Sequence, residues 1–142
     1  MEAIDEIYGL IWASGIVIPR GAVWERYHHL GESKYRQVGA TIITCFNNEG
    51  YCKKYIILLP GQTLPVHTHT VKRETFTLLY GDVRGLQIAE TMEIEPGTPH
   101  TLTTKGGAVI EEISTRYLPN DSTYEDKDIQ DNVNRKTQVK RF

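Results

Sequence analysis

Histidine and glutamate residues between positions 61 and 100 form a pattern suited to metal binding. His67 and His69 are two residues apart, so on a β-strand their side chains project from the same face. Glu74 lies five residues further on, beyond a predicted turn, and His100 follows a Pro-Gly turn that can return a strand beside the first histidines. Three imidazoles and one carboxylate are ligands that divalent transition metals accept. The sequence therefore predicts a metal site at these four residues.

The ligand types do not single out one metal. This set accepts manganese, zinc, iron, nickel or cobalt, of which we favour manganese or zinc. Such ligands on short strands inside a barrel leave coordination positions for water or substrate, as a catalytic site requires and a structural zinc site does not. The alternative is that the four residues are ordinary polar residues of a β-hairpin and a turn.

The chain that positions these residues is predicted to be one all-β domain. Its 142 residues fit a single domain, and 12 Gly with 6 Pro favour a turn-rich protein. Strands are expected over 40–46, 52–59, 74–80 and 108–117, with two short strands or a hairpin over 86–94. Together they predict an antiparallel sandwich or barrel. Apolar residues at a spacing of three and four predict a helix over 1–14 that Gly15 ends, and 22–37 match neither pattern.

Charge and composition argue against other partners. A formal net charge of -2 offers no electrostatic basis for binding nucleic acid or a membrane surface. No apolar stretch approaches the roughly 18 residues of a membrane span, and the acidic N-terminal residues are unlike a signal peptide, so a cytoplasmic location is expected. Cys45 and Cys52 flank a predicted hairpin turn, where a disulfide is sterically conceivable but two free thiols are favoured.

The spacing of Gly61, His67, His69, Glu74 and Gly81 resembles the first motif of the cupin superfamily. That motif is Gly, five residues, His-x-His, three or four residues, Glu, six residues and Gly, and this chain satisfies every spacing. The resemblance implies a small antiparallel jelly-roll β-barrel with a short N-terminal helix and a C-terminal extension. Cupins commonly pair through barrel edges, so a homodimer is expected.

The second cupin motif is matched less well. The segment Pro96-Gly97-Thr98-Pro99-His100 supplies the turn and the histidine, but its proline directly precedes the glycine. Ala89 stands near the place of the usual leading glycine, and Thr104 replaces the usual asparagine. The predicted metal ligands are unaffected, whereas the strand boundaries over 86–96 are left open.

A narrower resemblance extends along much of the chain. Residues 51–62 and the pattern His67-x-His69-x-x-Lys72-x-Glu74 resemble the D-lyxose isomerase group of sugar-isomerising cupins. Residues 109–115, 120–126 and 135–137 are similar to the end of the cupin domain fused to sialic acid synthase-type enzymes. Residues 1–142 then form one domain, with a helix and lead-in over 1–37, a barrel over 38–118 and a folded extension over 119–142.

The resemblance also implies roles for particular side chains. Lys72 matches a lysine that faces the substrate, and a nearby metal is expected to lower its pKa toward neutrality; the alternative is a solvated lysine. Strand alternation turns one of Glu111 and Glu112 inward, and Glu112 matches a family glutamate, so it is our candidate base; the alternative is that one is exposed and the other pairs with a cation. Further substrate contacts implied only by resemblance are Asp121, Tyr124 and Arg135.

The remaining aromatic residues have no assigned chemistry. His28 and His29 are adjacent and would face opposite ways on a strand, so we interpret them as structural or rim residues. The residues Trp24, Tyr27, Tyr55, Phe76 and Tyr80 could stack on a sugar ring, although such groups more often fill a core.

These features favour a metal-dependent enzyme of carbohydrate metabolism that isomerises or epimerises an open-chain sugar or sugar acid. Lys72 and Glu112 would move protons while the metal stabilises an enediolate. One alternative is a sugar-binding module that assists a nonulosonic acid synthase without chemistry. Another is an iron-dependent dioxygenase, because three histidines and a glutamate also suit ferrous iron.

Overall fold

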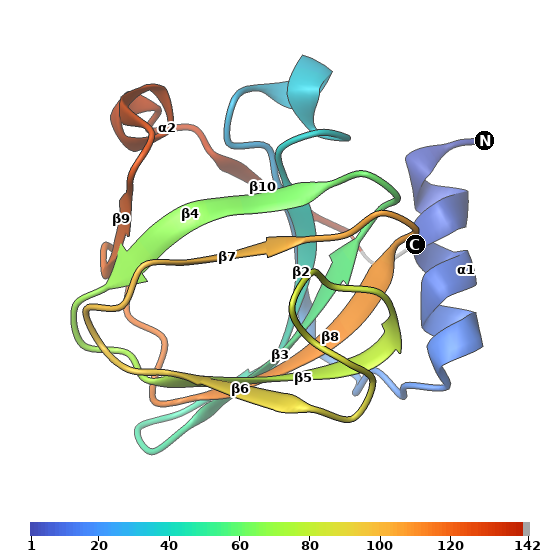
Figure 1. The fold of residues 1–142 in the computed structure, drawn as a ribbon, viewed down its shortest axis with the longest axis horizontal. Helices are drawn as coiled ribbons and strands as arrows, with labels where there is room; N and C mark the ends of the chain where they lie inside the picture. Colours follow the sequence, from blue (N-terminus) through green and yellow to red (C-terminus); the bar gives the residue numbers. More distant parts are fainter. Residues whose placement is uncertain (141–142) are drawn as a thin grey trace.

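A computed structural model describes residues 1–140 of the chain (Figure 1). The last two residues of the predicted extension, Arg141 and Phe142, lie outside the described residues. In chain order the elements are α1 (Ala3–Ser14), β1 (Val23–Tyr27), a 3₁₀ turn (Glu32–Lys34), β2 (Ala40–Asn47), β3 (Cys52–Leu58), β4 (Thr63–His69), β5 (Glu74–Gly81), β6 (Thr91–Ile94), β7 (His100–Thr103), β8 (Ala108–Ser114), β9 (Ser122–Tyr124), α2 (Lys127–Asp131) and β10 (Lys136–Val139). Within residues 1–140, no helix has the length and apolar character needed to cross a membrane.

Two antiparallel sheets face each other and enclose the interior. Across the described residues, the larger sheet has seven strands in the order β10-β1-β2-β3-β8-β5-β6, and the smaller has three in the order β7-β4-β9. Figure 1 shows β4 and β7 crossing opposite β5 and β6, with the barrel interior between them. The predicted all-β fold with a short N-terminal helix is confirmed.

Apolar side chains pack on both faces of the larger sheet. Inside the barrel, Ile56, Leu58, Phe76 and Ile110 belong to one buried cluster. On the outer face, helix α1 covers a second cluster through Ile7, and Gly15 ends the helix in a left-handed conformation, as predicted. This second layer explains why strand β3 is buried on both faces and lacks a clear alternation.

Two backbone positions explain how the motifs shape the barrel. Gly81, the last glycine of the first motif, has φ +84°, and a Cβ there would clash with the backbone carbonyl oxygen of Gly107. Ala89, near the place of the missing second-motif glycine, has φ +67°, a left-handed conformation that favours glycine. The strand or hairpin predicted over 86–94 is only partly formed: β6 starts at Thr91, because the chain turns back at Ala89.

The polar C-terminal segment is folded into both sheets. Strand β9 pairs with β4, and β10 pairs with β1, with Trp24 opposite Val139. Strand β1 lies within the segment 22–37 that sequence patterns left unassigned. Strands β1 and β10 thus extend the large sheet beyond the predicted barrel range 38–118, and the single-domain organisation stays a prediction. Cys45 and Cys52 are free thiols.

Candidate metal centre

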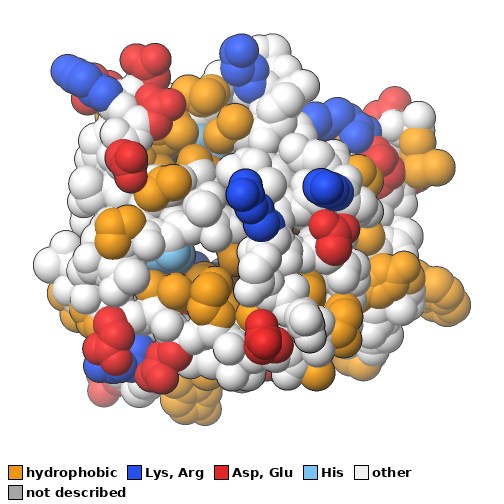
Figure 2. Space-filling model, in the orientation of Figure 1, with side chains coloured by type: hydrophobic (Ala, Val, Ile, Leu, Met, Phe, Trp, Pro, Cys, Tyr) orange, Lys and Arg blue, Asp and Glu red, His pale blue; other side chains and the backbone are white. Residues whose placement is uncertain are grey.

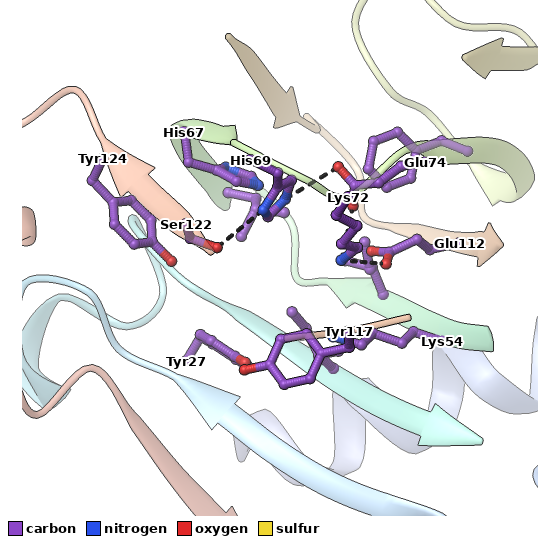
Figure 3. A pocket seen from close by; sticks show the side chains of 14 residues that line it. Tyr27, Lys54, His67, His69, Lys72, Glu74, Glu112, Tyr117, Ser122 and Tyr124 are labelled. Carbon is purple, nitrogen blue, oxygen red and sulfur yellow. Dashed lines mark hydrogen bonds and ion pairs between the residues drawn. The ribbon is translucent and has the colours of Figure 1, made fainter. Parts of the chain in front are cut away.

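The four predicted ligands meet inside the barrel. His67 and His69 lie on β4, His100 begins β7 opposite His67, and Glu74 begins β5 on the facing sheet. One ligand atom from each of the four lies within 4.8 Å of all the others, and all four residues are buried. Figure 3 shows His69 and Glu74 pointing toward one another. Histidine side chains accordingly cover only small areas of the face in Figure 2.

Backbone carbonyl groups orient two of the histidine rings. The Nδ1 atom of His67 donates to the Pro65 carbonyl at 2.8 Å, and that of His100 donates to the Thr98 carbonyl at 2.9 Å. A neutral imidazole with a protonated Nδ1 has its lone pair on Nε2, the atom available to a metal. The third ring, His69, has its Nδ1 atom 3.1 Å from the Ser122 hydroxyl (Figure 3).

The atoms that face the centre of this group are not satisfied by hydrogen bonds. Glu74 Oε1 lies 2.9 Å from His100 Nε2 and 3.2 Å from His69 Nε2. Among residues 1–140, none of these three buried atoms has a hydrogen bond of good geometry. Buried polar atoms without partners are costly, and a divalent metal would satisfy all three. The donor set thus fits a metal ion.

The charge states of His67 and Glu74 suit a metal site, whereas Glu74 and the Thr98 carbonyl outweigh burial and raise the pKa of His100. Burial and then the neighbouring His100 lower the pKa of His67 to about 3, which keeps its imidazole neutral. Burial raises the pKa of Glu74, but the close His100 and His69 rings and the Lys72 charge outweigh burial and hold it well below its usual range. Neutral imidazoles and an ionised carboxylate are the ligand forms that metals bind.

Lys72 and Glu112 form a buried ion pair beside the cluster. Lys72 Nζ lies 2.8 Å from Glu112 Oε2 and 3.2 Å from Glu74 Oε2. Burial lowers the pKa of Lys72, but the Glu112 and Glu74 carboxylates outweigh burial and raise this pKa above its ordinary value. The lowering of the Lys72 pKa that we expect beside a bound metal stays a prediction, and the two carboxylates around the ammonium act in the opposite direction.

The two neighbouring glutamates face opposite ways, as strand alternation predicted. Glu112 is buried inside the barrel, whereas Glu111 lies on the outer face and pairs with Lys53 at 3.3 Å. Asp121, one of the residues singled out by resemblance, does not line the cavity. Its carboxylate accepts hydrogen bonds from the backbone N–H groups of residues 70, 71 and 72 at 3.0–3.1 Å, and so fixes the loop that carries Lys72.

Comparisons with known proteins agree with this geometry. No family model matches the chain. A D-lyxose/D-mannose isomerase of Thermosediminibacter oceani is 36% identical over 59 residues, which span 37% of this chain and 33% of that protein. The match thus covers about a third of the length of this curated relative.

Solved structures resemble nearly the whole chain. An L-ribose isomerase of Cellulomonas parahominis superposes with a TM-score of 0.64 at 14% identity, over 90% of this chain and 91% of that one. A Klebsiella pneumoniae protein described by its double-stranded β-helix domain superposes with a TM-score of 0.54 at 16% identity, over 62% of this chain and 85% of that one. This chain has the cupin fold. The first-motif residues of the cupin barrel include Gly61, Gly81 and three of the four clustered ligands.

A second buried lysine in the cupin barrel was missed by sequence reasoning. Lys54 on β3 stands opposite Glu112 on β8, and its Nζ lies 3.8 Å from the centre of the Tyr117 ring. Burial lowers the pKa of Lys54, although the Glu112 charge opposes this. A signal was available, because Lys54, Ile56 and Leu58 alternate along the strand and therefore share its inner face.

Aromatic residues divide between the cavity and the core. Tyr27, Phe76 and Tyr124 line the cavity beside the cluster, while Trp24 and Tyr55 belong to the outer core and Tyr80 packs against it. His28 and His29 are both buried away from the ligands. His28 Nε2 lies 2.8 Å from the Thr137 hydroxyl, joining the end of β1 to β10. His29 packs against the Tyr27 and Tyr124 rings.

Proposed function

We propose that this cupin is a metal-dependent isomerase that interconverts an aldose and a ketose. The observation that carries the proposal is the buried Lys72–Glu112 pair, whose Nζ–Oε2 distance is 2.8 Å, directly beside a cluster fit for a divalent metal. A site that only bound sugar or activated oxygen would not require a buried proton donor and acceptor there. Their presence favours proton transfer at carbon and oxygen of one substrate.

Two residues of this chain can share the proton transfers, Glu112 at carbon and Lys72 at oxygen. Glu112 takes the proton from carbon 2 of the open-chain aldose and returns it to carbon 1. Lys72, whose ammonium form the two carboxylates stabilise, donates a proton to oxygen 1 and recovers one from oxygen 2. The reaction passes through an enediolate and needs no oxidant or reductant. A divalent ion held by His67, His69, Glu74 and His100 would supply Lewis-acid stabilisation of the negative charge on those oxygens.

The relatives support the class of reaction. The Thermosediminibacter protein, of which a third is matched, is named a D-lyxose/D-mannose isomerase, and the Cellulomonas structure is of an L-ribose isomerase with L-ribose. These names agree on the isomerisation of a monosaccharide, while they differ in the sugar. We therefore propose the class and leave the sugar to experiment.

Metal analysis and deuterium incorporation test this function together. The purified protein is expected to contain about one divalent transition metal per chain and, in deuterated water, to place solvent deuterium at carbon 1 or 2 of one sugar in a panel of aldoses and ketoses. A His67→Ala variant should lose both the metal and the exchange. Unchanged metal content in His67→Ala would contradict the site, and metal without any exchange would contradict the reaction.

The two other hypotheses give different results in the same assays. A sugar-binding module would bind one panel sugar without exchanging hydrogen at any carbon. A dioxygenase would consume oxygen in the presence of ferrous iron and would show no isomerisation under argon. The isomerase is expected to turn over its sugar equally well in air and under argon.

A further inference from the structure

The cavity of the barrel consists of two neighbouring chambers. The inner chamber is lined by three of the four clustered residues, His67, His69 and Glu74, and by Lys72 and Glu112, and has a volume of about 40 Å³. The outer chamber, of about 230 Å³, is lined by the segment that follows β8 and by the start of β10. Tyr27, Tyr117 and Ser122 line both chambers, as does Tyr124, so the two chambers adjoin each other. Figure 3 shows these shared side chains around the inner chamber.

The inner chamber is too small for a whole sugar. A water molecule needs roughly 10–15 Å³ of such volume, so the inner chamber accommodates only a few atoms next to a metal ion. The reacting carbon and oxygen atoms would fill it. The remainder of an open-chain substrate must then lie in the outer chamber, whose lining determines what that remainder is.

The charged side chains that line the outer chamber are both cations. Within residues 1–140 its lining includes Arg135 and Lys136 and no carboxylate. The Arg135 guanidinium stacks on the Tyr124 ring at 4.7 Å, and its Nη1 donates to the carbonyl groups of Ile129 and Gln130 at 3.1 and 3.3 Å. In the described part of the chain, Nε and Nη2 of Arg135 have no hydrogen-bond partner, so two donors remain for a ligand.

Lys136 adds a weaker contribution. Its Nζ lies 3.2 Å from the Tyr117 hydroxyl and 3.4 Å from the Tyr27 hydroxyl, at the boundary of the two chambers. Glu25 neutralises part of this charge from outside the chamber, at 3.0 Å from the same Nζ. Arg135 is therefore the principal cation of the outer chamber, and Lys136 supports it.

The cavity as a whole has an excess of positive charge, although the whole chain does not. Four cations line the two chambers, namely Lys54, Lys72, Arg135 and Lys136, against the two carboxylates Glu74 and Glu112. The chain itself has a net charge of -2, and cationic and anionic side chains are interspersed over the face in Figure 2. A divalent metal would increase the excess. A cavity with an excess of positive charge attracts anionic ligands.

The geometry points to a substrate that carries an anionic group. We propose that a phosphate or carboxylate at the end of the sugar remote from its carbonyl binds in the outer chamber to Arg135, with Lys136 in support. The Tyr124 ring lies close to both ends, with its centre 4.7 Å from the Arg135 guanidinium carbon and 5.7 Å from the centre of the His67 ring. The placement of the sugar carbonyl in the inner chamber, with the anionic end in the outer chamber, rests on the proposed function.

Calorimetric titration of the metal-loaded full chain tests the proposal. The panel consists of five- and six-carbon aldoses, the same sugars with a terminal phosphate, and the matching uronic acids. The best anionic member is expected to bind at least about tenfold more tightly than its neutral counterpart, because charge-assisted hydrogen bonds to guanidinium are strong. The phosphate and uronate arms identify which anion is preferred. Neutral sugars that bind as tightly as both anionic series would overturn the proposal, as would no binding by any member.

Single substitutions test which side chains cause the preference for anionic over neutral sugars. Arg135→Gln should reduce the ratio of neutral to anionic dissociation constants about tenfold, Lys136→Gln should reduce it less, and Arg20→Gln on the exposed surface should leave it unchanged. Because Arg135 also holds the carbonyl groups of α2, Arg135→Lys and a thermal unfolding curve for each variant separate charge from folding. An anionic preference that persists in both folded Gln variants would overturn the assignment. Selective anion binding without hydrogen exchange would contradict only the proposed function.

Discussion

At the scale of single residues, the neighbours Glu111 and Glu112 provide an internal control for catalysis. Glu112→Gln removes the proposed base from the inner chamber, and we expect turnover to fall by about 10²–10⁴-fold with metal content unchanged. Glu111→Gln makes the same chemical change on the outer face, where Glu111 pairs with Lys53, and should change turnover less than about twofold. Steady-state kinetics and metal analysis of both variants check this. Equal losses in the two variants would remove Glu112 from the mechanism.

His29 predicts a pH-dependent stability that is independent of catalysis. Burial, and then the Arg135 charge, lower its pKa to about 4, while the unfolded chain has a histidine pKa near 6.5. Below about pH 6.5 this histidine binds a proton in the unfolded chain but not in the folded chain. The contribution of His29 to the free energy of unfolding is therefore fully present above about pH 6.5 and decreases as the pH falls to about 4. Between pH 7 and 4.5, unfolding free energy should fall about 2–3 kcal/mol more in the parent chain than in His29→Phe.

Urea unfolding of the two metal-free chains at both pH values measures this difference. His67, whose pKa is also lowered by burial, is present in both chains, so the comparison isolates His29. An equal pH dependence in the two chains would show that His29 takes up a proton in the folded state as readily as in the unfolded state.

Spacing alone predicted the residues that cluster in the barrel, but not every charged residue of the cavity. His67, His69 and Glu74 belong to one short motif, so their spacing carries the information. Lys54 and Tyr117 lie outside that motif, and strand β3 is buried on both faces, so its alternation does not show which face turns inward. The raised pKa of Lys72 depends on Glu112 from another strand, a contact that the spacing of the motif does not give.

At the scale of elements, the two outer glycines of the first motif differ in what they require. Both have positive φ, +79° at Gly61 and +84° at Gly81, but only at Gly81 would a Cβ meet the neighbouring backbone. Gly61→Ala should therefore cost about 1 kcal/mol of unfolding free energy, from backbone strain alone. Gly81→Ala should cost about 3 kcal/mol or more, because strain and overlap with Gly107 combine. Urea denaturation of both variants measures the difference, and similar costs would refute the close approach.

Asp121 provides a second test at this scale. Its carboxylate holds three backbone N–H groups of the loop that ends at Lys72, so Asp121→Asn should lower both stability, by about 1–2 kcal/mol, and turnover. Asp126→Asn is the matched control, because the Asp126 carboxylate accepts from the N–H of Asp128 at the start of α2 and not from the loop of Lys72, so it should affect stability only. Thermal unfolding and kinetics separate the two effects. Turnover that is unchanged in folded Asp121→Asn would remove the positioning role.

Strands formed by polar residues were the part of the fold that sequence patterns missed. Strand β10 has the sequence Lys-Thr-Gln-Val and is mostly exposed, and β1 contains Glu25 and Arg26. Neither has the apolar alternation of a half-buried strand. Strand β10 pairs with β1, more than 100 residues away in sequence, and β1 lies between β10 and β2. Only the family resemblance indicated that the C-terminal segment is folded.

At the scale of the whole molecule, the fold follows from enclosing a polar centre within an apolar barrel. The inner cluster of Ile56, Leu58 and Phe76 surrounds buried histidines and carboxylates whose inward atoms lack hydrogen bonds among residues 1–140. Such a centre destabilises the barrel unless a cation satisfies it. The cytoplasmic location and the homodimer stay predictions.

Metal should therefore stabilise the whole barrel and not only the site. An ion that binds the folded chain and not the unfolded one adds about 2.7 kcal/mol of stability at a hundredfold excess over its dissociation constant. For a domain of this size that corresponds to a rise in Tm of roughly 5–10 °C. Chelation should abolish the rise, and His67→Ala should show none, whereas a variant that leaves the ligands intact, Glu111→Gln, should retain it in full. Differential scanning calorimetry with and without added manganese or zinc measures these shifts, and a Tm that responds equally in His67→Ala would place the stabilising ion elsewhere.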